Sequence, residues 1–170
     1  VGENLQDHFT FSGLLYGLKI NSLLENSSPK FMLDASYEYL MNRTGLLQTH
    51  PFLTVAGFVK TNSSAKSERP NFQFHFNNIA INDLDSVESF SRNNGLNEET
   101  TNSLQKLALE TNILMILPTL SLPKSRGKIT LRSSDPFAHP KIYPGYLSDS
   151  EGRDVKTMLE GIKLIQKIMK

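Results

Sequence analysis

Residues 71–77 read Asn-Phe-Gln-Phe-His-Phe-Asn and place an aromatic ring at every second position. Side chains alternate between the two faces of a β-strand, so this period predicts a strand whose faces differ in chemistry. One face carries Gln73 and His75. The other face carries the three rings Phe72, Phe74 and Phe76. This is the clearest strand in the sequence, and the rest of the fold is inferred outward from it.

Four other segments also predict strands. Residues 9–20 are rich in Phe, Leu, Tyr and Ile and are interrupted by glycines, which suits a strand with bends. A strand is also expected within 52–61. Residues 112–122 are strongly apolar but interrupted by Pro118, as in a buried strand with a bend or an edge. Residues 128–132 alternate like a half-buried strand. The apolar positions of that last segment are Ile129 and Leu131.

Three segments predict helices. Ser28 and Pro29 supply a cap and a first-turn proline for a helix that ends near Asn42. A second helix is expected over 98–109. A third begins after a capping Asp149 and carries an amphipathic stripe. The apolar stripe consists of Val155, Met158, Leu159, Ile162, Ile165 and Ile168 or Met169.

The remaining residues predict connections. Residues 61–70 form a polar loop, and 78–101 are polar and turn-rich, which predicts an irregular excursion. Strands in series with helices inserted between them, without regular strand–helix alternation, indicate an α+β fold. We therefore expect an antiparallel sheet with helices packed on one side.

Composition excludes several classes of function. The 18 basic and 17 acidic side chains give a net charge of +1, which offers no footprint for nucleic acid. No apolar run approaches the roughly 20 residues that cross a bilayer, so no transmembrane segment is predicted. The absence of cysteine removes disulfides and thiolate chemistry. Three glycosylation sequons, at Asn26, Asn42 and Asn62, slightly favour a secreted protein.

The sequence contains no motif that specifies a reaction. The four histidines are scattered without the spacing of a metal site, so no metal is predicted. They are His8, His50, His75 and His139. His75 has two interpretations, a polar group within an aromatic pocket or a histidine on the exposed face of the sheet. Neither a phosphate-binding loop nor a Gly-x-Ser-x-Gly elbow is present. The carboxylates of the polar stretches are interpreted as solvated surface.

Two blocks of the chain resemble one family. Residues 1–8, Val-Gly-Glu-Asn-Leu-Gln-Asp-His, resemble the Val-Gly-x-Asn-Leu-x-Asp-His signature of the glucose-methanol-choline (GMC) oxidoreductases. Residues 123–131, with 134–136, 140–142 and 146–147, are similar to that family's Pro-x-Ser-Arg-Gly-x-Ile-x-Leu…Asp-Pro…Pro-x-Ile…Tyr-Leu block. Weaker family landmarks lie between the two blocks, so the resemblance covers nearly the whole chain.

The resemblance implies part of an FAD-dependent enzyme that oxidises alcohols by passing hydride to the flavin. In this family a sheet of about six antiparallel strands walls the substrate side of a two-domain flavoenzyme. The chain is then expected to be an internal piece, with residues 1–8 leaving the FAD domain, 9–147 forming the substrate-binding domain, and 148–170 beginning the return. The glycine-rich nucleotide turn is expected before Val1 and the catalytic histidine after Lys170, so no catalytic residue is assigned here.

The resemblance also implies which residues approach the ligands. Asn4 lies in the signature segment and is expected near the cofactor. One parity of the aromatic strand, either the three rings or Gln73 and His75, is expected to face the flavin cavity. A sugar, a choline-like alcohol and a sterol all remain open as the small-molecule alcohol substrate, and the electron acceptor is also open.

Two alternative hypotheses come from other functional classes. In the first, the parent protein is a family member that has lost catalysis. In the second, the piece is a freestanding binding or structural module. A chain of this kind on its own is expected to be inactive toward alcohols.

Overall fold

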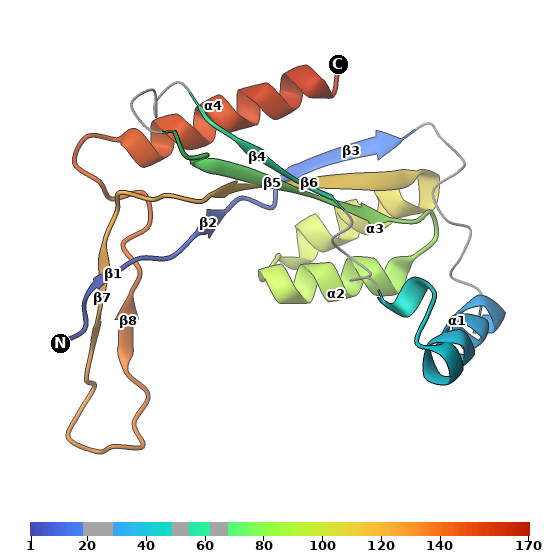
Figure 1. The fold of residues 1–170 in the computed structure, drawn as a ribbon, viewed down its shortest axis with the longest axis horizontal. Coiled ribbons are helices and arrows are strands. Elements are labelled where there is room, and N and C mark those ends of the chain that lie inside the picture. The colour runs from blue at the N-terminus through green and yellow to red at the C-terminus, as the bar shows by residue number, and fades with distance from the viewer. Residues whose placement is uncertain (19–28, 49–54, 62–67) are drawn as a thin grey trace. The chain divides into compact units, whose positions relative to one another are not determined.

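The computed structural model describes residues 1–18, 29–48, 55–61 and 68–170 (Figure 1). Within them the chain forms helices and short strands in an α+β arrangement, which confirms the predicted fold class. The strands are β1 (Glu3–Leu5), β2 (Phe9–Thr10), β3 (Leu14–Leu18), β4 (Val55–Val59), β5 (Phe72–Ile79), β6 (Asn112–Leu120), β7 (Gly127–Thr130) and β8 (Lys141–Tyr143). The helices are α1 (Pro29–Asn42), α2 (Leu84–Asn94), α3 (Glu98–Glu110) and α4 (Arg153–Ile168), with a short 3₁₀ turn at Leu46–Gln48.

The strands form two sheets. The larger sheet has five strands, with the hydrogen-bonded order β2-β6-β5-β4 and with β3 also paired to β6. Both β2 and β3 run antiparallel to β6, pairing Phe9 with Leu120 and Leu14 with Ile116. The smaller sheet has the order β1-β7-β8, also with antiparallel pairs. The strand predicted over 71–77 is confirmed by β5, which begins one residue later, at Phe72, and extends to Ile79.

The chain divides into two compact units. The first consists of residues 1–11, 57–74 and 118–170, and the second of 12–56 and 75–117. Strands β5 and β6 contribute residues to both units.

In the second unit, α2 and α3 pack their apolar sides against strand residues. The core of this unit consists of Ile79, Val87, Leu104, Ala108, Ile113 and Met115. Each helix starts at a side-chain cap, which satisfies amide groups that a helix start leaves free. The Asp83 carboxylate accepts a hydrogen bond from Ser86 N at 3.0 Å, and the Asn97 side chain accepts one from Thr100 N at 2.9 Å.

In the first unit, two aromatic rings of β5 are buried by packing against glycines of other elements. Phe72 is fully buried beside Gly161 of α4, and Phe74 lies against Gly57 of β4. A side-chain carbon at either glycine would overlap a ring, so these glycines allow the close approach. The start of β5 is fixed by Asn71, whose amide accepts from Thr61 N at 2.9 Å and donates to Thr61 Oγ1 at 2.8 Å.

One predicted irregular segment is wrong. Residues 78–101 were expected to form an excursion without regular structure before the next helix, but they contain the whole of α2. The helix begins after the Asp83 cap and ends at Gly95, which adopts the left-handed conformation with φ +63°. The predicted helix over 98–109 is confirmed by α3.

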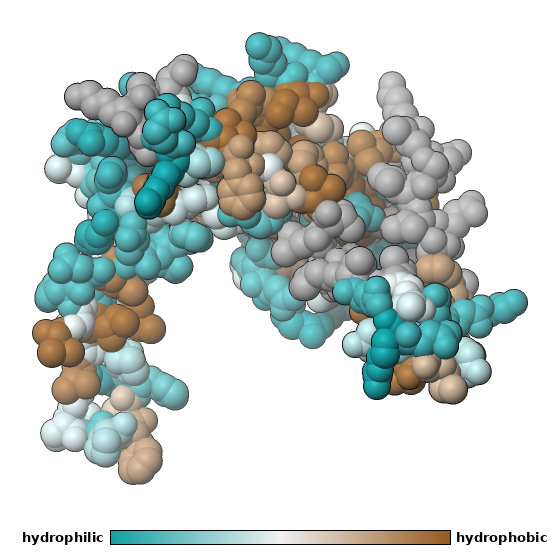
Figure 2. Space-filling view, viewed as in Figure 1, coloured by the Kyte–Doolittle hydropathy of each residue, from teal (hydrophilic) through white to brown (hydrophobic). Residues whose placement is uncertain are grey.

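The predicted buried strand over 112–122 is confirmed by β6, which continues through Pro118. On either side of the proline the strand passes from its β3 partner, ending at Ile116, to its β2 partner, beginning at Thr119. The expectation for a second strand is corrected. The segment 128–132 is not half-buried, since Leu131 is 84% exposed and lies beyond the end of β7. Apolar side chains therefore gather on the surface of the β7–β8 hairpin (Figure 2).

The last helix is confirmed with two differences. Asp149 does cap it, accepting from Arg153 N at 2.7 Å and Asp154 N at 3.1 Å, but the residue at the cap position is Gly152. The predicted apolar stripe is only partly covered. Met158 and Ile165 are buried, while three other members of the stripe are exposed. The exposed members are Val155, Leu159 and Ile168.

Some expectations fall outside the described residues. They concern the end of the 9–20 strand, Ser28 as a cap, His50, the start of the 52–61 strand, most of the 61–70 loop and the sequons at Asn26 and Asn62. Asn42, in the third sequon, is exposed at the last position of α1. Among the helices described, none combines the length and the apolar character needed to span a bilayer.

The contact between Gly161 and Phe72 yields a prediction that separates packing from helix propensity. Replacing an interior helix glycine by alanine normally stabilises a helix by about 1 kcal/mol. We expect Gly161→Ala instead to lower the free energy of unfolding by about 1–3 kcal/mol, because the added methyl overlaps a ring that is fully buried. Urea unfolding measures the change, with exposed Gln166→Ala on the same helix as control. A more stable Gly161→Ala protein would contradict the packing.

Candidate functional site

The two parities of β5 have different environments. Phe72 and Phe74 are buried in the first unit, whereas Gln73 and His75 are only partly buried. Phe76, of the ring parity, is also partly buried. Burial lowers the pKa of the His75 imidazole from its ordinary value of 6.5. The ring is therefore neutral at neutral pH, with one nitrogen donating and the other accepting.

The opening signature folds onto the second matching block. Gly2 has φ +87°, and its carbonyl oxygen accepts from Ile129 N of β7 at 2.7 Å. A side chain at Gly2 would collide with the Ile129 carbonyl, so only glycine fits. Gln6 then donates from its amide to the Pro123 carbonyl at 2.8 Å. The two segments that resemble the family are thus in direct contact.

Asn4 lies on β1 in a left-handed backbone conformation, with φ +63°. Asparagine tolerates this conformation better than most residues with a side chain. Its side chain is exposed. Asn4 and the aromatic strand are not in the same sheet, because β1 pairs with β7 while β5 lies between β6 and β4.

A second contact joins the opening segment to the end of the matching block. The Tyr146 hydroxyl donates to the Asp7 carboxylate, and this hydrogen bond raises the pKa of Tyr146 above its ordinary value of 10.0. The Tyr146 ring also packs against Phe9, with the ring centroids 5.6 Å apart.

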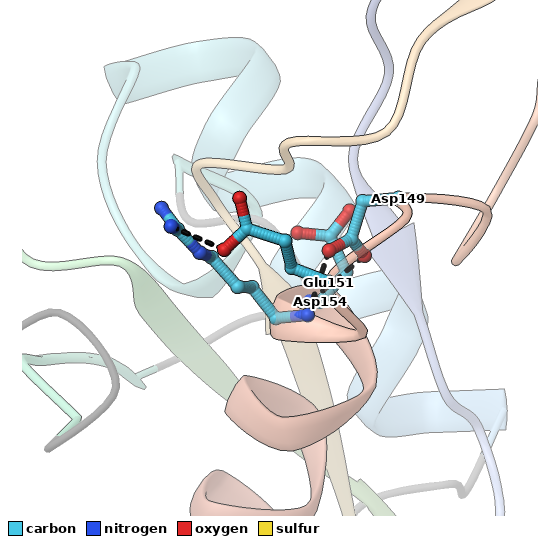
Figure 3. Close-up of polar contacts among 4 residues, drawn as sticks. Asp149, Glu151 and Asp154 are labelled. Atoms are coloured by element: carbon cyan, nitrogen blue, oxygen red, sulfur yellow. Dashed lines mark hydrogen bonds and ion pairs between the residues drawn. The ribbon is translucent and has the colours of Figure 1, made fainter.

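A buried carboxylate at the start of α4 organises the start of the long matching block, and Figure 3 shows this residue, Asp154, beside Asp149 and Glu151. Asp154, in the first turn of α4, is only 2% exposed. Its oxygens accept from Lys124 N at 2.8 and 3.1 Å, from Ser125 N at 2.8 Å and from Ser125 Oγ at 2.6 Å. Ser125 Oγ in turn accepts from Asp149 N at 3.0 Å. These bonds replace water around the buried charge and fix the turn before β7.

Sequence analysis did not identify Asp154. It assigned the cap to Asp149, and an acidic residue in the first turn of a helix is common enough to attract no notice. No local pattern distinguishes a carboxylate that binds a loop 29 or 30 residues away. The arrangement is structural, since both carboxylate oxygens are occupied by the chain itself. Across the ranges that the structure describes, no three His, Asp or Glu side chains come together as metal ligands.

The sequence of the chain was compared with protein families and with known proteins. Residues 123–170 match the family described as GMC oxidoreductase. The chain is 34% identical over 166 residues to an alcohol dehydrogenase [acceptor] of Pseudomonas putida, covering 96% of the chain and 25% of that protein. It is 30% identical to the glucose dehydrogenase [FAD, quinone] of Drosophila pseudoobscura pseudoobscura, and 32% to the oxygen-dependent choline dehydrogenase of Acinetobacter baumannii (strain AYE). Those alignments cover 96% and 99% of the chain, and 23% and 26% of the relatives.

The chain belongs to the GMC oxidoreductase family. It spans about a quarter of the length of the curated relatives it matches. An FAD-dependent oxidoreductase from Chaetomium thermophilum, solved in complex with a small fragment, has a similar fold with a TM-score of 0.57. That similarity has 16% sequence identity and covers 96% of this chain and 30% of the other.

In this member of the GMC oxidoreductase family, the Asp154 network predicts a graded loss of stability. We expect Asp154→Ala to lower the free energy of unfolding by about 2–4 kcal/mol, since it leaves buried amide and hydroxyl donors without an acceptor. Ser125→Ala should cost about 1–2 kcal/mol. The control is Glu151→Ala, whose carboxylate pairs with Arg153 on the surface and should contribute less than about 1 kcal/mol. Equal losses in all three variants would refute the assignment.

Proposed function

We propose that the protein containing this chain is an FAD-dependent oxidoreductase acting on the CH–OH group of a small alcohol or sugar. The observation that carries the proposal is the extent of the similarity to relatives named alcohol, glucose and choline dehydrogenases. Each alignment covers at least 96% of this chain, so it includes the strands and helices as well as the signature segments. The chain itself then forms part of the wall on the substrate side.

The residues present fit a supporting role toward FAD. The chain lacks the glycine-rich turn that holds a pyrophosphate, so it does not bind the nucleotide by that means. The side-chain amide of Asn4 is exposed, and Asn4 lies on β1, which pairs with β7. We assign Asn4 to the cofactor side of the protein. When bound, FAD supplies the capacity to accept hydride, while the protein supplies orientation and shape.

The substrate side is assigned to one parity of β5. Phe72 and Phe74 are occupied by packing within the first unit, which leaves Gln73 and His75 as the parity with accessible polar atoms. The neutral imidazole of His75 is suited to hydrogen-bonding an alcohol hydroxyl. On this assignment, residues 1–8 leave the cofactor domain, 9–147 form the substrate domain and 148–170 begin the return.

The proposal is tested first on the full-length protein purified under native conditions. We expect it to carry FAD and expect the flavin to be reduced when alcohols or glucose are added without oxygen. Flavin absorbance measures both properties. Flavin without reduction by any alcohol would replace the proposal with a catalytically inactive relative. A protein that neither carries nor takes up FAD would refute the proposal outright.

The assignment of His75 is tested by a pair of histidine variants. We expect His75→Ala to raise KM for the preferred alcohol about tenfold, which corresponds to the loss of roughly one hydrogen bond. His139 is exposed in a loop between β7 and β8, so His139→Ala should leave KM and kcat unchanged. Steady-state kinetics at matched flavin content measures the difference. An unchanged KM in His75→Ala would move the substrate away from this parity.

A further inference from the structure

One glycosylation sequon lies within the described residues and has no part in the sites above. Asn42, Arg43 and Thr44 form the triplet Asn-x-Thr, whose middle residue is not proline. Such a triplet also arises by chance, so the sequence alone does not assign a modification. The position and the surroundings of Asn42 in the fold decide whether a bulky group can be attached there.

Asn42 is the last residue of α1, and its side chain is exposed. The helix ends there because Arg43 adopts a left-handed conformation with φ +56°. Arg43 N donates to the Tyr39 carbonyl at 2.9 Å, which closes the last turn. Gly45 is also left-handed, with φ +87°, so the chain turns away from the helix within three residues. Asn42 therefore stands at a helix end that is followed by a tight turn.

The two residues that complete the sequon fold back onto α1. The guanidinium carbon of Arg43 lies 5.5 Å from the centre of the Tyr39 ring. Thr44 Oγ1 donates to Glu38 Oε1 at 3.2 Å. The side-chain amide of Asn42, in contrast, makes no hydrogen bond to any residue that the structure describes. Its nitrogen can thus be substituted without breaking a contact among those residues.

The apolar side of α1 points away from Asn42. Leu33, Tyr37 and Leu40 are exposed and recur at intervals of four and three residues, so they share one side of the helix. Asn42 follows Leu33 by nine residues, which is about two and a half helical turns, so it projects to the opposite side. A hydrophilic group on Asn42 therefore leaves the apolar side uncovered.

We propose that Asn42 carries an N-linked glycan. In this transfer the Asn42 amide nitrogen bonds to the anomeric carbon of a lipid-linked oligosaccharide pyrophosphate. The bond from that carbon to the pyrophosphate oxygen breaks, the lipid pyrophosphate leaves with the bonding electrons, and the amide gives up one proton. The folded chain must then leave room for the glycan, as it does at the exposed Asn42. The proposal places the parent protein on a secretory route and does not rest on the proposed enzymatic activity.

The test uses the full-length protein, produced from its complete coding sequence in eukaryotic cells. Peptide N-glycosidase in heavy-oxygen water converts a glycosylated asparagine to an isotope-marked aspartate. Trypsin then releases residues 31–43, in which Asn42 is the single asparagine, so the mark is separated from the other sequons. We expect mass spectrometry to find the mark in this peptide, and to find none in a sample treated without the glycosidase. An unmarked peptide from the glycosidase-treated protein would overturn the proposal.

A matched pair of substitutions at Thr44 separates glycosylation from other changes to Asn42. Thr44→Ser keeps the sequon hydroxyl and should keep the mark, whereas Thr44→Ala leaves Asn42 in place and should abolish the mark. Glu38→Ala controls for the lost hydrogen bond, because it removes the partner of Thr44 and should also keep the mark. A mark that persists in Thr44→Ala, or that disappears from Thr44→Ser or Glu38→Ala, would contradict the assignment.

The outcomes remain separate from those of the proposed function. Flavin content and reduction by alcohols report on the flavoenzyme, whereas the isotope mark reports on Asn42. We expect Asn42→Gln to lower the mass of the intact protein by one glycan. An intact mass that does not fall in this variant would refute the modification, whatever the flavin measurements show.

Discussion

A single buried carboxylate determines how the family-matching block is held. A carboxylate buried away from water needs hydrogen-bond donors for its oxygens, and those of Asp154 come from Lys124 and Ser125. The chain before β7 is therefore fixed to the first turn of α4. Since β7 is the central strand of the smaller sheet, its position also fixes β1 and with it Asn4. The signature segment is placed by a residue far from it in sequence.

The two sides of strand β5 have different roles, one in packing and one exposing polar groups. Phe72 and Phe74 are held against glycines, so changes there are expected to alter packing before anything else. Gln73 and His75 retain partial exposure and polar atoms, so changes there can alter binding without removing core volume. Alternation of side chains along a strand is what permits this separation. The separation holds for the first half of the strand, since Ile79, which has the same parity as His75, belongs to the core of the second unit.

Much of the fold could be predicted because its determinants are local. The period of residues 71–77, the proline at the start of α1 and the apolar spacing of α4 each depend on near neighbours, and each predicted element is present. Burial could not be predicted in the same way. The alternation at Ile129 and Leu131 is that of a half-buried strand, yet Leu131 is exposed, because burial depends on a partner surface that a strand does not encode.

The features of the candidate site could not be predicted from local sequence patterns for a related reason. Which face of β5 is buried depends on Gly57 and Gly161, and the role of Asp154 depends on a loop about 30 residues away. Helix α2 was missed because the pattern that identifies most helices is an apolar side facing inward. Only Val87 and Ser91 of α2 are buried, and most of its other positions are polar and exposed, so the stretch has the composition of a loop. It forms a helix because Asp83 caps its first turn, Gly95 ends it, and Val87 packs into the core of the second unit.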